Sequence, residues 1–278
     1  KLIPSIFSSG ITQINILIGT IIASFETGAV SYLYYADRIY QINLAIAGIA
    51  VGTVSLPALS KAFKKKDIKK LSNIQSKSFE LSLLLSLPAS VALILASEEI
   101  VSVLFGYGSF TEDNVKLTSY ALKYFGYGVP AFALVKILSN FFFARDNTKT
   151  PFYISAAIVL INVSISLSLF PSYGFVIIPI ATSISTWTGI LIYIYLLNQK
   201  NSLLLNTEII SNFIKILIST TIMSVILVLL LNNYETYLNY SYKFKAIYLL
   251  SIVCLTGIVY LISCYILGVL KIKNYKIK

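Results

Sequence analysis

Long apolar runs separated by short polar segments dominate the pattern along this chain. A transmembrane helix needs about 20 mostly apolar residues, and about eight segments meet that requirement. The segments are residues 4–25, 31–57, 77–97, 118–142, 151–170, 174–198, 209–231 and 246–270. The pattern therefore predicts an all-α fold, a polytopic transmembrane helical bundle of about eight helices.

The connections between these runs alternate in charge. The segment 58–76 is rich in lysine, whereas the next connection, 98–117, carries Glu98, Glu99, Glu112 and Asp113 against Lys116. Short connections rich in lysine and arginine lie on the cytoplasmic side of a membrane. The pattern predicts a basic cytoplasmic loop at 58–76. An even number of spans then places both ends of the chain, including the basic tail, in the cytoplasm.

The acidic connection contains a short apolar stretch that is too short to cross a membrane. It covers residues 100–105 and precedes the turn sequence Gly106-Tyr107-Gly108. One interpretation is an interfacial helix followed by a turn. The other, an extension of the third span, agrees equally well with the sequence.

Composition supports a membrane protein and excludes several other classes. Only 12% of the residues are charged and the mean hydropathy is +0.81, whereas soluble domains carry about 25% charged residues. The net charge of +11 is spread over the connections, so no nucleic-acid partner is expected. Cys254 and Cys264 lie about 15 Å apart on a helix, too far for a disulfide. Without histidine a zinc site is not expected, and without a phosphate-binding loop or a nucleophile beside paired carboxylates we expect neither an enzyme nor a cofactor.

The second span carries the most informative polar residues. Ser31, Arg38, Ala45 and Gly52 recur every seven residues, which places them on one face of an α-helix. Gln41, Gly48 and Ser55 fall on the same side. The sequence therefore predicts one small and polar stripe that carries a cation.

Arg38 has two interpretations that the residues alone leave open. An arginine at mid-span costs about 2.5 to 3.5 kcal/mol, and such residues usually face a bundle interior or a wet cavity. There the guanidinium could bind a phosphate through two parallel hydrogen bonds. Alternatively, Arg38 pairs with Asp37 or Glu26, or extends to the membrane surface.

Three further residues in the second span and one in the fourth complete the candidate set. Asp37 points about 100° away from Arg38 and is expected to face another helix. Gly48 and Gly52 form a G-x-x-x-G motif, which permits close helix contact and a structural or gating role. Lys136 is a second candidate for a cavity cation, and the alternative is a lysine paired within the bundle.

Three motifs resemble one known family. The segment YYADRI at 34–39 is followed by GIAVGTVSLPALS at 48–60, YGSFT stands at 107–111, and FARDNTKTP stands at 143–151. In order and spacing they resemble the MurJ/MviN family of lipid II flippases. The resemblance covers essentially the whole chain, as the C-terminal eight of that family's fourteen helices.

The resemblance implies a fold of the MOP exporter superfamily, with two helical lobes around a central cavity. It implies that residues 1–57 line the cavity, that residues 77–198 complete the lobe, and that residues 199–278 form a lipid-tail groove and a basic cytoplasmic tail. Arg38, Ser31 and Lys136 match cavity positions of the family. Gln41 departs from the pattern, because some relatives have glutamate there, so a required charge at this position is in doubt.

The expected function is that of a transporter. It would flip lipid II, the undecaprenyl-pyrophosphate-linked peptidoglycan precursor, across the bacterial inner membrane by alternating access. Its partners would be lipid II, membrane lipids and N-terminal helices of the same protein, because the chain resembles a C-terminal fragment. The alternatives are export of another polyprenyl-linked saccharide or a drug, and an inactive or scaffolding remnant of a split gene.

Overall fold

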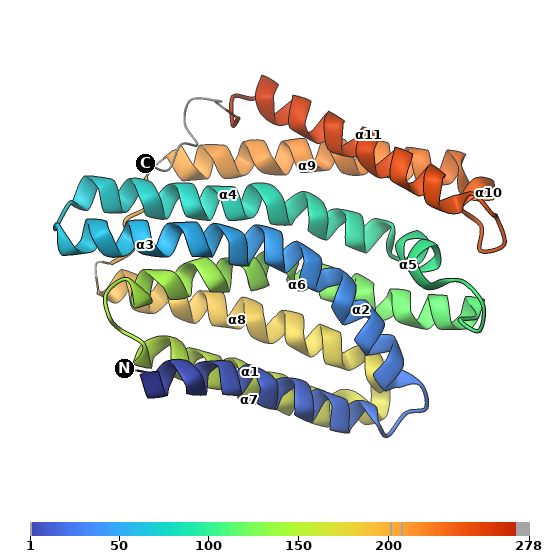
Figure 1. Cartoon of the computed structure of the whole chain (residues 1–278), viewed down its shortest axis with the longest axis horizontal. Helices are drawn as coiled ribbons and strands as arrows, with labels where there is room; N and C mark the ends of the chain where they lie inside the picture. Colours follow the sequence, from blue (N-terminus) through green and yellow to red (C-terminus); the bar gives the residue numbers. More distant parts are fainter. Residues whose placement is uncertain (1, 201, 207, 271–278) are drawn as a thin grey trace.

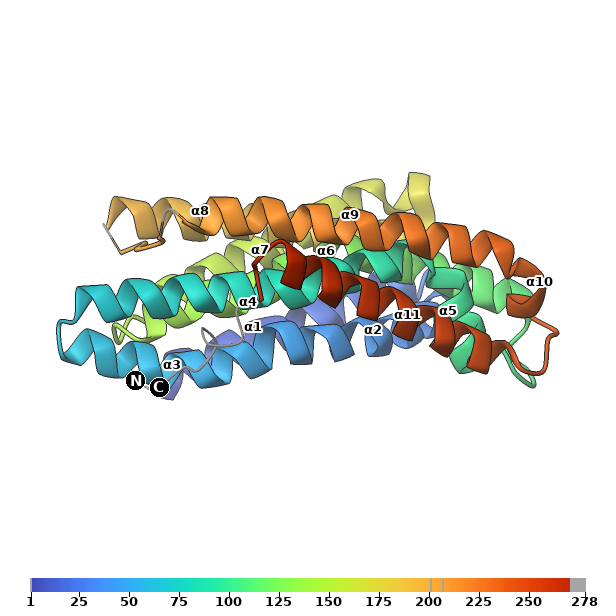
Figure 2. The ribbon, with the colours of Figure 1, turned by 90° about the horizontal axis from the view of Figure 1, so that it is seen from above.

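The chain folds into a bundle of long helices, shown in the computed structural model in Figure 1. The structure describes residues 2–200, 202–206 and 208–270. The helices are α1 (Leu2–Ala23), α2 (Ala29–Leu44), the π-helix η1 (Ala45–Ala50), α3 (Val51–Lys64), α4 (Ile68–Leu95), α5 (Ser97–Phe105), α6 (Glu112–Phe143), α7 (Lys149–Tyr173), the 3₁₀ turn η2 (Gly174–Val176), α8 (Ile177–Gln199), α9 (Glu208–Asn233), α10 (Glu235–Leu238) and α11 (Lys245–Ile266). The long helices run along one common direction when the bundle is seen from above (Figure 2).

Each of the predicted spans corresponds to a long helix. Six continuous helical stretches in the described chain are long and apolar enough to cross a membrane, and Gln13–Ala23 in α1 is a shorter apolar helix. One stretch, Lys149–Gln199, contains both α7 and α8. Gly174 separates these two at φ 63°, a conformation that glycine adopts without strain. An all-α membrane bundle is therefore confirmed.

The second span is one continuous helix of 36 residues, Ala29–Lys64. Its middle, Ala45–Ala50, is a π-helix rather than an α-helix. A π-helix bonds residue i to i+5, so each turn is wider and the side chains beyond it are rotated relative to an α-helix. The hydrophobic pattern alone gave no indication of this change.

The prediction of a basic loop over 58–76 is wrong in its extent. Helix α3 continues to Lys64 and α4 begins at Ile68, which leaves Lys65, Lys66 and Asp67 as the connection. Asp67 caps α4 by accepting a hydrogen bond from the backbone N–H of Lys70 at 2.9 Å. Lysine is a good helix former, and both helix ends are exposed, so the basic segment extends the two spans as helix.

The acidic connection does contain a separate short helix. Helix α4 ends at Leu95, Ala96 has non-helical backbone angles, and α5 ends at Phe105, just before Gly106. The interpretation as a short helix followed by a turn is confirmed, and the extension of the third span is wrong. Lys245, at the start of α11, holds this region in place: its ammonium donates to Ser102 Oγ at 3.1 Å, to the Gly106 carbonyl at 3.0 Å and to the Tyr240 carbonyl at 2.9 Å.

Helix α6 is the central helix of the bundle. It contacts α2, α3, α4, α5 and α8, and 78% of the residues in its most apolar stretch are buried. From α8 the bundle continues to α7 and α1 on one side, and from α4 it continues to the α9–α11 hairpin on the other (Figure 1). This arrangement leaves one long face of α2 and α3 exposed along its length, including Tyr34, Ile42 and Val54.

The connection between α8 and α9 is fixed to α4 by side chains. Gln75, which is fully buried, donates to the carbonyl of Ser202 at 3.1 Å and accepts from the N–H of Leu204 at 2.8 Å. Arg145, at the end of α6, also donates to the carbonyl of Ser202 at 2.8 Å. Residues 202–204, between α8 and α9, are therefore bonded to α4 and to the end of α6.

Candidate substrate-binding site

A cavity of about 590 Å³ opens beside the π-helix. Its lining comes from α1, η1, α3, α6, α7 and α8, and we call it the central cavity. Its polar lining residues are Gln13, Thr53, Lys136, Ser139, Asn140, Ser155 and Tyr193. Gln13 and Tyr193, which are far apart in the sequence, thus line the same cavity. It opens on the side where the α2–α3 face is uncovered.

Lys136 supplies the positive charge of the central cavity. Its side chain is exposed, and the structure records no ion pair or hydrogen bond of its ammonium with any residue in the described ranges. Among the residues that the structure describes, the alternative of a lysine paired within the bundle is therefore wrong. An ammonium at membrane depth is costly unless water or an anionic group meets it, so an anionic ligand would be stabilised here.

The two glycines of the second span form the packed floor of the cavity. A Cβ atom on Gly48 would lie 3.1 Å from the Cα of Ala133, and one on Gly52 would lie 3.1 Å from Nδ2 of Asn140. That same Nδ2 donates to the carbonyl of Gly52 at 2.8 Å. The predicted close helix contact through Gly48 and Gly52 is confirmed, whereas a gating role stays a prediction.

Arg38 lies outside the central cavity, on the exposed face of α2. Its guanidinium carbon is 4.7 Å from the centre of the Tyr34 ring. Gln41 donates a hydrogen bond to the carboxylate of Asp37, and Glu26 accepts one from the N–H of Phe175 at 2.7 Å. Neither carboxylate forms an ion pair with Arg38 in the part of the chain that is described, so the pairing alternative receives no support.

The predicted polar stripe divides into an exposed part and a buried part. Ser31, Arg38 and Ala45 are exposed, as the stripe required. Gly48, Gly52 and Ser55 are buried instead. The π-helix separates the two groups, because its wider turn rotates the later residues toward α6. The half-buried Gln41 and Asp37 pair within α2, so Asp37 is engaged by its own helix.

The structure does not bring Arg38 and Lys136 into one pocket. Gly48 is the first residue of the second span that lines the cavity. Arg38 precedes it by ten residues, which is roughly 15 Å along the helix. Both cations nevertheless lie on exposed surface of the same lobe. A ligand that reaches both would have to be long, or would have to move along the α2–α3 face.

Several lining residues were missed by sequence reasoning. Gln13 interrupts an apolar run in the first span, and that interruption is a visible indication. Thr53 and Ser155 are small hydroxyl residues of a kind that packs helices together throughout membrane proteins. Nothing in the sequence distinguishes these two from packing residues, because their helices meet only in the folded bundle.

A family model and individual relatives of this chain point to the same family. The family model described as lipid II flippase MurJ matches residues 1–250. The probable lipid II flippase MurJ of Rhizobium tropici is 39% identical over 233 residues, which are 84% of this chain and 44% of that protein. The corresponding protein of Rickettsia prowazekii (strain Madrid E) is 36% identical over 273 residues, covering 98% of this chain and 54% of that protein. The chain thus spans about half the length of these curated relatives.

Solved structures agree with this grouping. A lipid II flippase MurJ in an inward closed conformation superposes with a TM-score of 0.77 at 27% identity, covering 95% of this chain and 52% of that one. An outward-facing multidrug resistance MATE transporter of the MOP superfamily gives a TM-score of 0.64 at 16% identity, which supports the fold alone. With the family match over residues 1–250 and the relatives above, this chain belongs to the MurJ family of lipid II flippases.

Proposed function

We propose that this chain forms one lobe of a lipid II flippase of the bacterial inner membrane. The substrate would be undecaprenyl-pyrophosphate-linked disaccharide-pentapeptide, and it would cross by alternating access without a covalent step. The observation that carries the proposal is an open cavity lined by Lys136, which has no ion-pair partner among the described residues, in a member of this family. A cation facing open space in a membrane bundle suits an anionic, lipid-linked substrate.

The two cations have different proposed roles. Arg38 binds the pyrophosphate, because a guanidinium can donate two parallel hydrogen bonds to a phosphate group. Ser31, on the same exposed face, and the half-buried Gln41 offer further hydrogen bonds to the substrate. Lys136 assists from the central cavity as a point charge. Because the two cations do not line one pocket, the substrate would contact them in succession during transport.

The opposite wall of the transport path would come from the N-terminal helices of the same protein. The uncovered face of α2 and α3 supports this, because a bundle exposes polar groups inside a membrane only toward protein or water. The end of the bundle that carries the α3–α4 turn would be cytoplasmic, because Lys64, Lys65, Lys66, Lys69 and Lys70 gather there. We call this end the basic end. Membrane lipids would contact α9 and α11.

Charge removal in the whole protein tests these roles. Arg38→Ala should abolish growth of a bacterial strain depleted of its own MurJ, although the protein still inserts into the membrane. Losing hydrogen bonds to a charged group costs about 1.5 to 3 kcal/mol, which corresponds to roughly 10- to 150-fold weaker binding. Lys136→Ala should also reduce growth, and Arg38→Lys should retain little activity because it cannot pair in a bidentate manner.

The matched control is Lys243→Ala, which removes an exposed lysine far from the cavity and should grow normally. Native mass spectrometry with lipid II and with other polyprenyl-linked saccharides separates the proposal from export of a different substrate. Normal growth of the Arg38→Ala strain, at wild-type protein levels, would contradict the assignment.

A further inference from the structure

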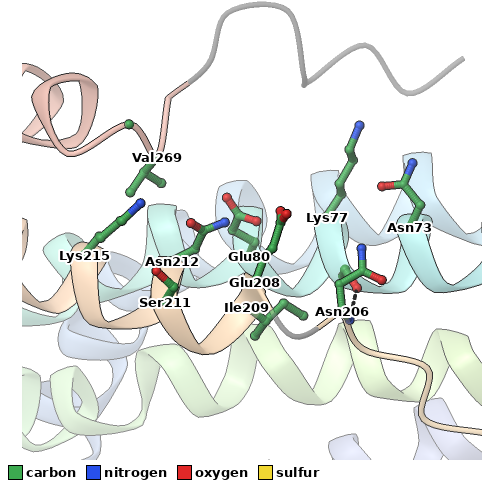
Figure 3. A pocket seen from close by; sticks show the side chains of 12 residues that line it. Asn73, Lys77, Glu80, Asn206, Glu208, Ile209, Ser211, Asn212, Lys215 and Val269 are labelled. Carbon is green, nitrogen blue, oxygen red and sulfur yellow. Dashed lines mark hydrogen bonds between the residues drawn. The ribbon is translucent and has the colours of Figure 1, made fainter.

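A second cavity, of about 410 Å³, lies between α4, α9 and the segment that follows α11. Figure 3 shows the side chains that line it. The lining residues are Asn73, Ser76, Lys77, Glu80, Asn206, Glu208, Ile209, Ser211, Asn212, Lys215, Gly268 and Val269. We call it the α4–α9 pocket. It shares no lining residue with the central cavity, so it is a separate site.

The pocket lies at the level where the lipid-facing helices end. Glu208 is the first residue of α9, and Gly268 follows the last residues of α11. Both helices are apolar enough to cross a membrane, so their ends mark the boundary between hydrocarbon and headgroups. The α3–α4 turn extends beyond the start of α9 at the basic end (Figure 1). The pocket is thus placed at the membrane surface, where lipid headgroups lie.

The lining carries charges of both signs. Glu80 from α4 and Glu208 from α9 both line the pocket, and in the view of Figure 3 they appear between Lys215 and Lys77. The formal charges of these four residues cancel. An anion alone would meet two carboxylates, and a cation alone would meet two ammonium groups. A ligand with separated positive and negative charges matches the lining better than either.

Two hydrogen bonds fasten the segment before α9 to the wall that α4 forms. The N–H of Asn206 donates to Ser76 Oγ at 2.9 Å, and Ser72 donates to the side-chain oxygen of Asn206 at 2.7 Å. The segment before α9 is therefore fastened to α4. A ligand would enter a site whose shape is already formed, which reduces the entropic cost of binding.

We propose that the α4–α9 pocket binds the headgroup of a zwitterionic phospholipid that carries a primary ammonium, as phosphatidylethanolamine does. The ammonium would lie between Glu80 and Glu208 and donate hydrogen bonds to their oxygens, and the phosphate would contact Lys215. The acyl chains would run along α9 and α11, whose side chains Ile210, Ile214 and Ile266 are 70%, 51% and 74% exposed. The volume lies in the range of small-molecule sites, about 300 to 1,000 Å³.

Three phospholipids with identical acyl chains test the proposal on the whole protein in detergent. Phosphatidylethanolamine should bind at least about fivefold more tightly than phosphatidylcholine, whose quaternary ammonium has no N–H donor. It should also bind more tightly than phosphatidylglycerol, which has no cation. Glu208→Gln should reduce the preference to less than about twofold, because it removes one of the two carboxylates that accept hydrogen bonds from the ammonium. Lys215→Gln should weaken the binding of all three lipids, because each of them carries the phosphate that Lys215 contacts.

The matched control is Glu235→Gln, an exposed carboxylate at the opposite end of the bundle, which should keep the preference. Soluble phosphoethanolamine should not displace the lipid, since it lacks the acyl chains that contact α9 and α11. Equal affinity for the three lipids would overturn the proposal, as would a preference that survives Glu208→Gln or a lipid affinity that Lys215→Gln leaves unchanged. Lipid II translocation by Glu208→Gln is a separate readout, so failure here leaves the proposed function standing.

Discussion

At the scale of single residues, buried polar side chains bond to backbone carbonyls of other helices. Tyr260 donates to the carbonyl of Leu84 at 2.7 Å, Ser90 donates to that of Gly126 at 2.7 Å, and Asn140 donates to that of Gly52. Such bonds contribute only about 0.6 kcal/mol on average in membrane proteins. They specify which helix faces meet, because any other arrangement of the helices would leave a polar group in the hydrocarbon without a hydrogen-bond partner.

Lys245 is the residue for which we expect the largest effect of this kind. It is 1% exposed, it makes three hydrogen bonds, and its ammonium lies 4.6 Å and 4.7 Å from the rings of Tyr107 and Tyr240. Lys245→Met leaves buried acceptors unpaired, and each unsatisfied group costs about 1 to 3 kcal/mol. Thermal unfolding in detergent should show a clear loss of stability. Lys243→Met, two residues away and exposed, is the control, and equal stability of the two variants would refute this role.

Glu99 should make stability depend on pH. Burial raises the pKa of its carboxyl group, with further repulsion from Glu98 and Glu235. Because the folded-state pKa lies above the unfolded value, stability falls as pH rises through the unfolded pKa of about 4.3. Glu99→Gln should therefore be more stable than the wild type at neutral pH and equal to it near about pH 3.5. Thermal unfolding at both pH values is the measurement, and a destabilising effect at neutral pH would contradict the argument.

At the scale of helices, apolar length predicted the existence of the spans but not their ends. The spans expected at 77–97 and 118–142 begin earlier, at Ile68 and Glu112, because Asp67 and Thr111 cap them. Polar residues that follow a cap continue a helix beyond the hydrocarbon, and hydropathy does not detect such extensions. The π-helix at Ala45–Ala50 also escaped prediction, and Gly48 within it packs closely against Ala133 of α6, a contact that exists only in the folded bundle.

The segment between α8 and α9 offers a test at this scale. Gln75→Ala removes both hydrogen bonds to residues 202–204 without touching the apolar faces of the helices. Losing a hydrogen bond of about 1 to 1.4 kcal/mol should speed amide hydrogen exchange at Leu204 by up to roughly tenfold. The exposed Asn73 provides the control, as Asn73→Ala. Unchanged exchange at Leu204 in the Gln75→Ala protein would show that the segment is held by other contacts.

At the scale of the whole molecule, the chain is a helical bundle in which one face of α2 and α3 is uncovered and carries Arg38 among apolar side chains. The sequence identified Arg38 and Lys136 as unusual because charges inside a membrane are costly. It did not predict that the π-helix separates Arg38 from the central cavity, nor that Gln13 and Ser155 complete the lining. Those features depend on which helices become neighbours in the folded bundle. A resemblance of short motifs does not show how far one helix is shifted along its neighbour.

Translocation of lipid II in proteoliposomes tests the central claim most directly. The chain would be reconstituted together with the N-terminal half of the same protein, with lipid II supplied to one leaflet and detected in the other. We expect transfer with both halves, no transfer with either half alone, and at least about tenfold slower transfer when Arg38→Ala and Lys136→Ala are combined, since two charged contacts are lost. Equal transfer by that double variant, or no transfer by correctly inserted wild-type halves, would contradict the account.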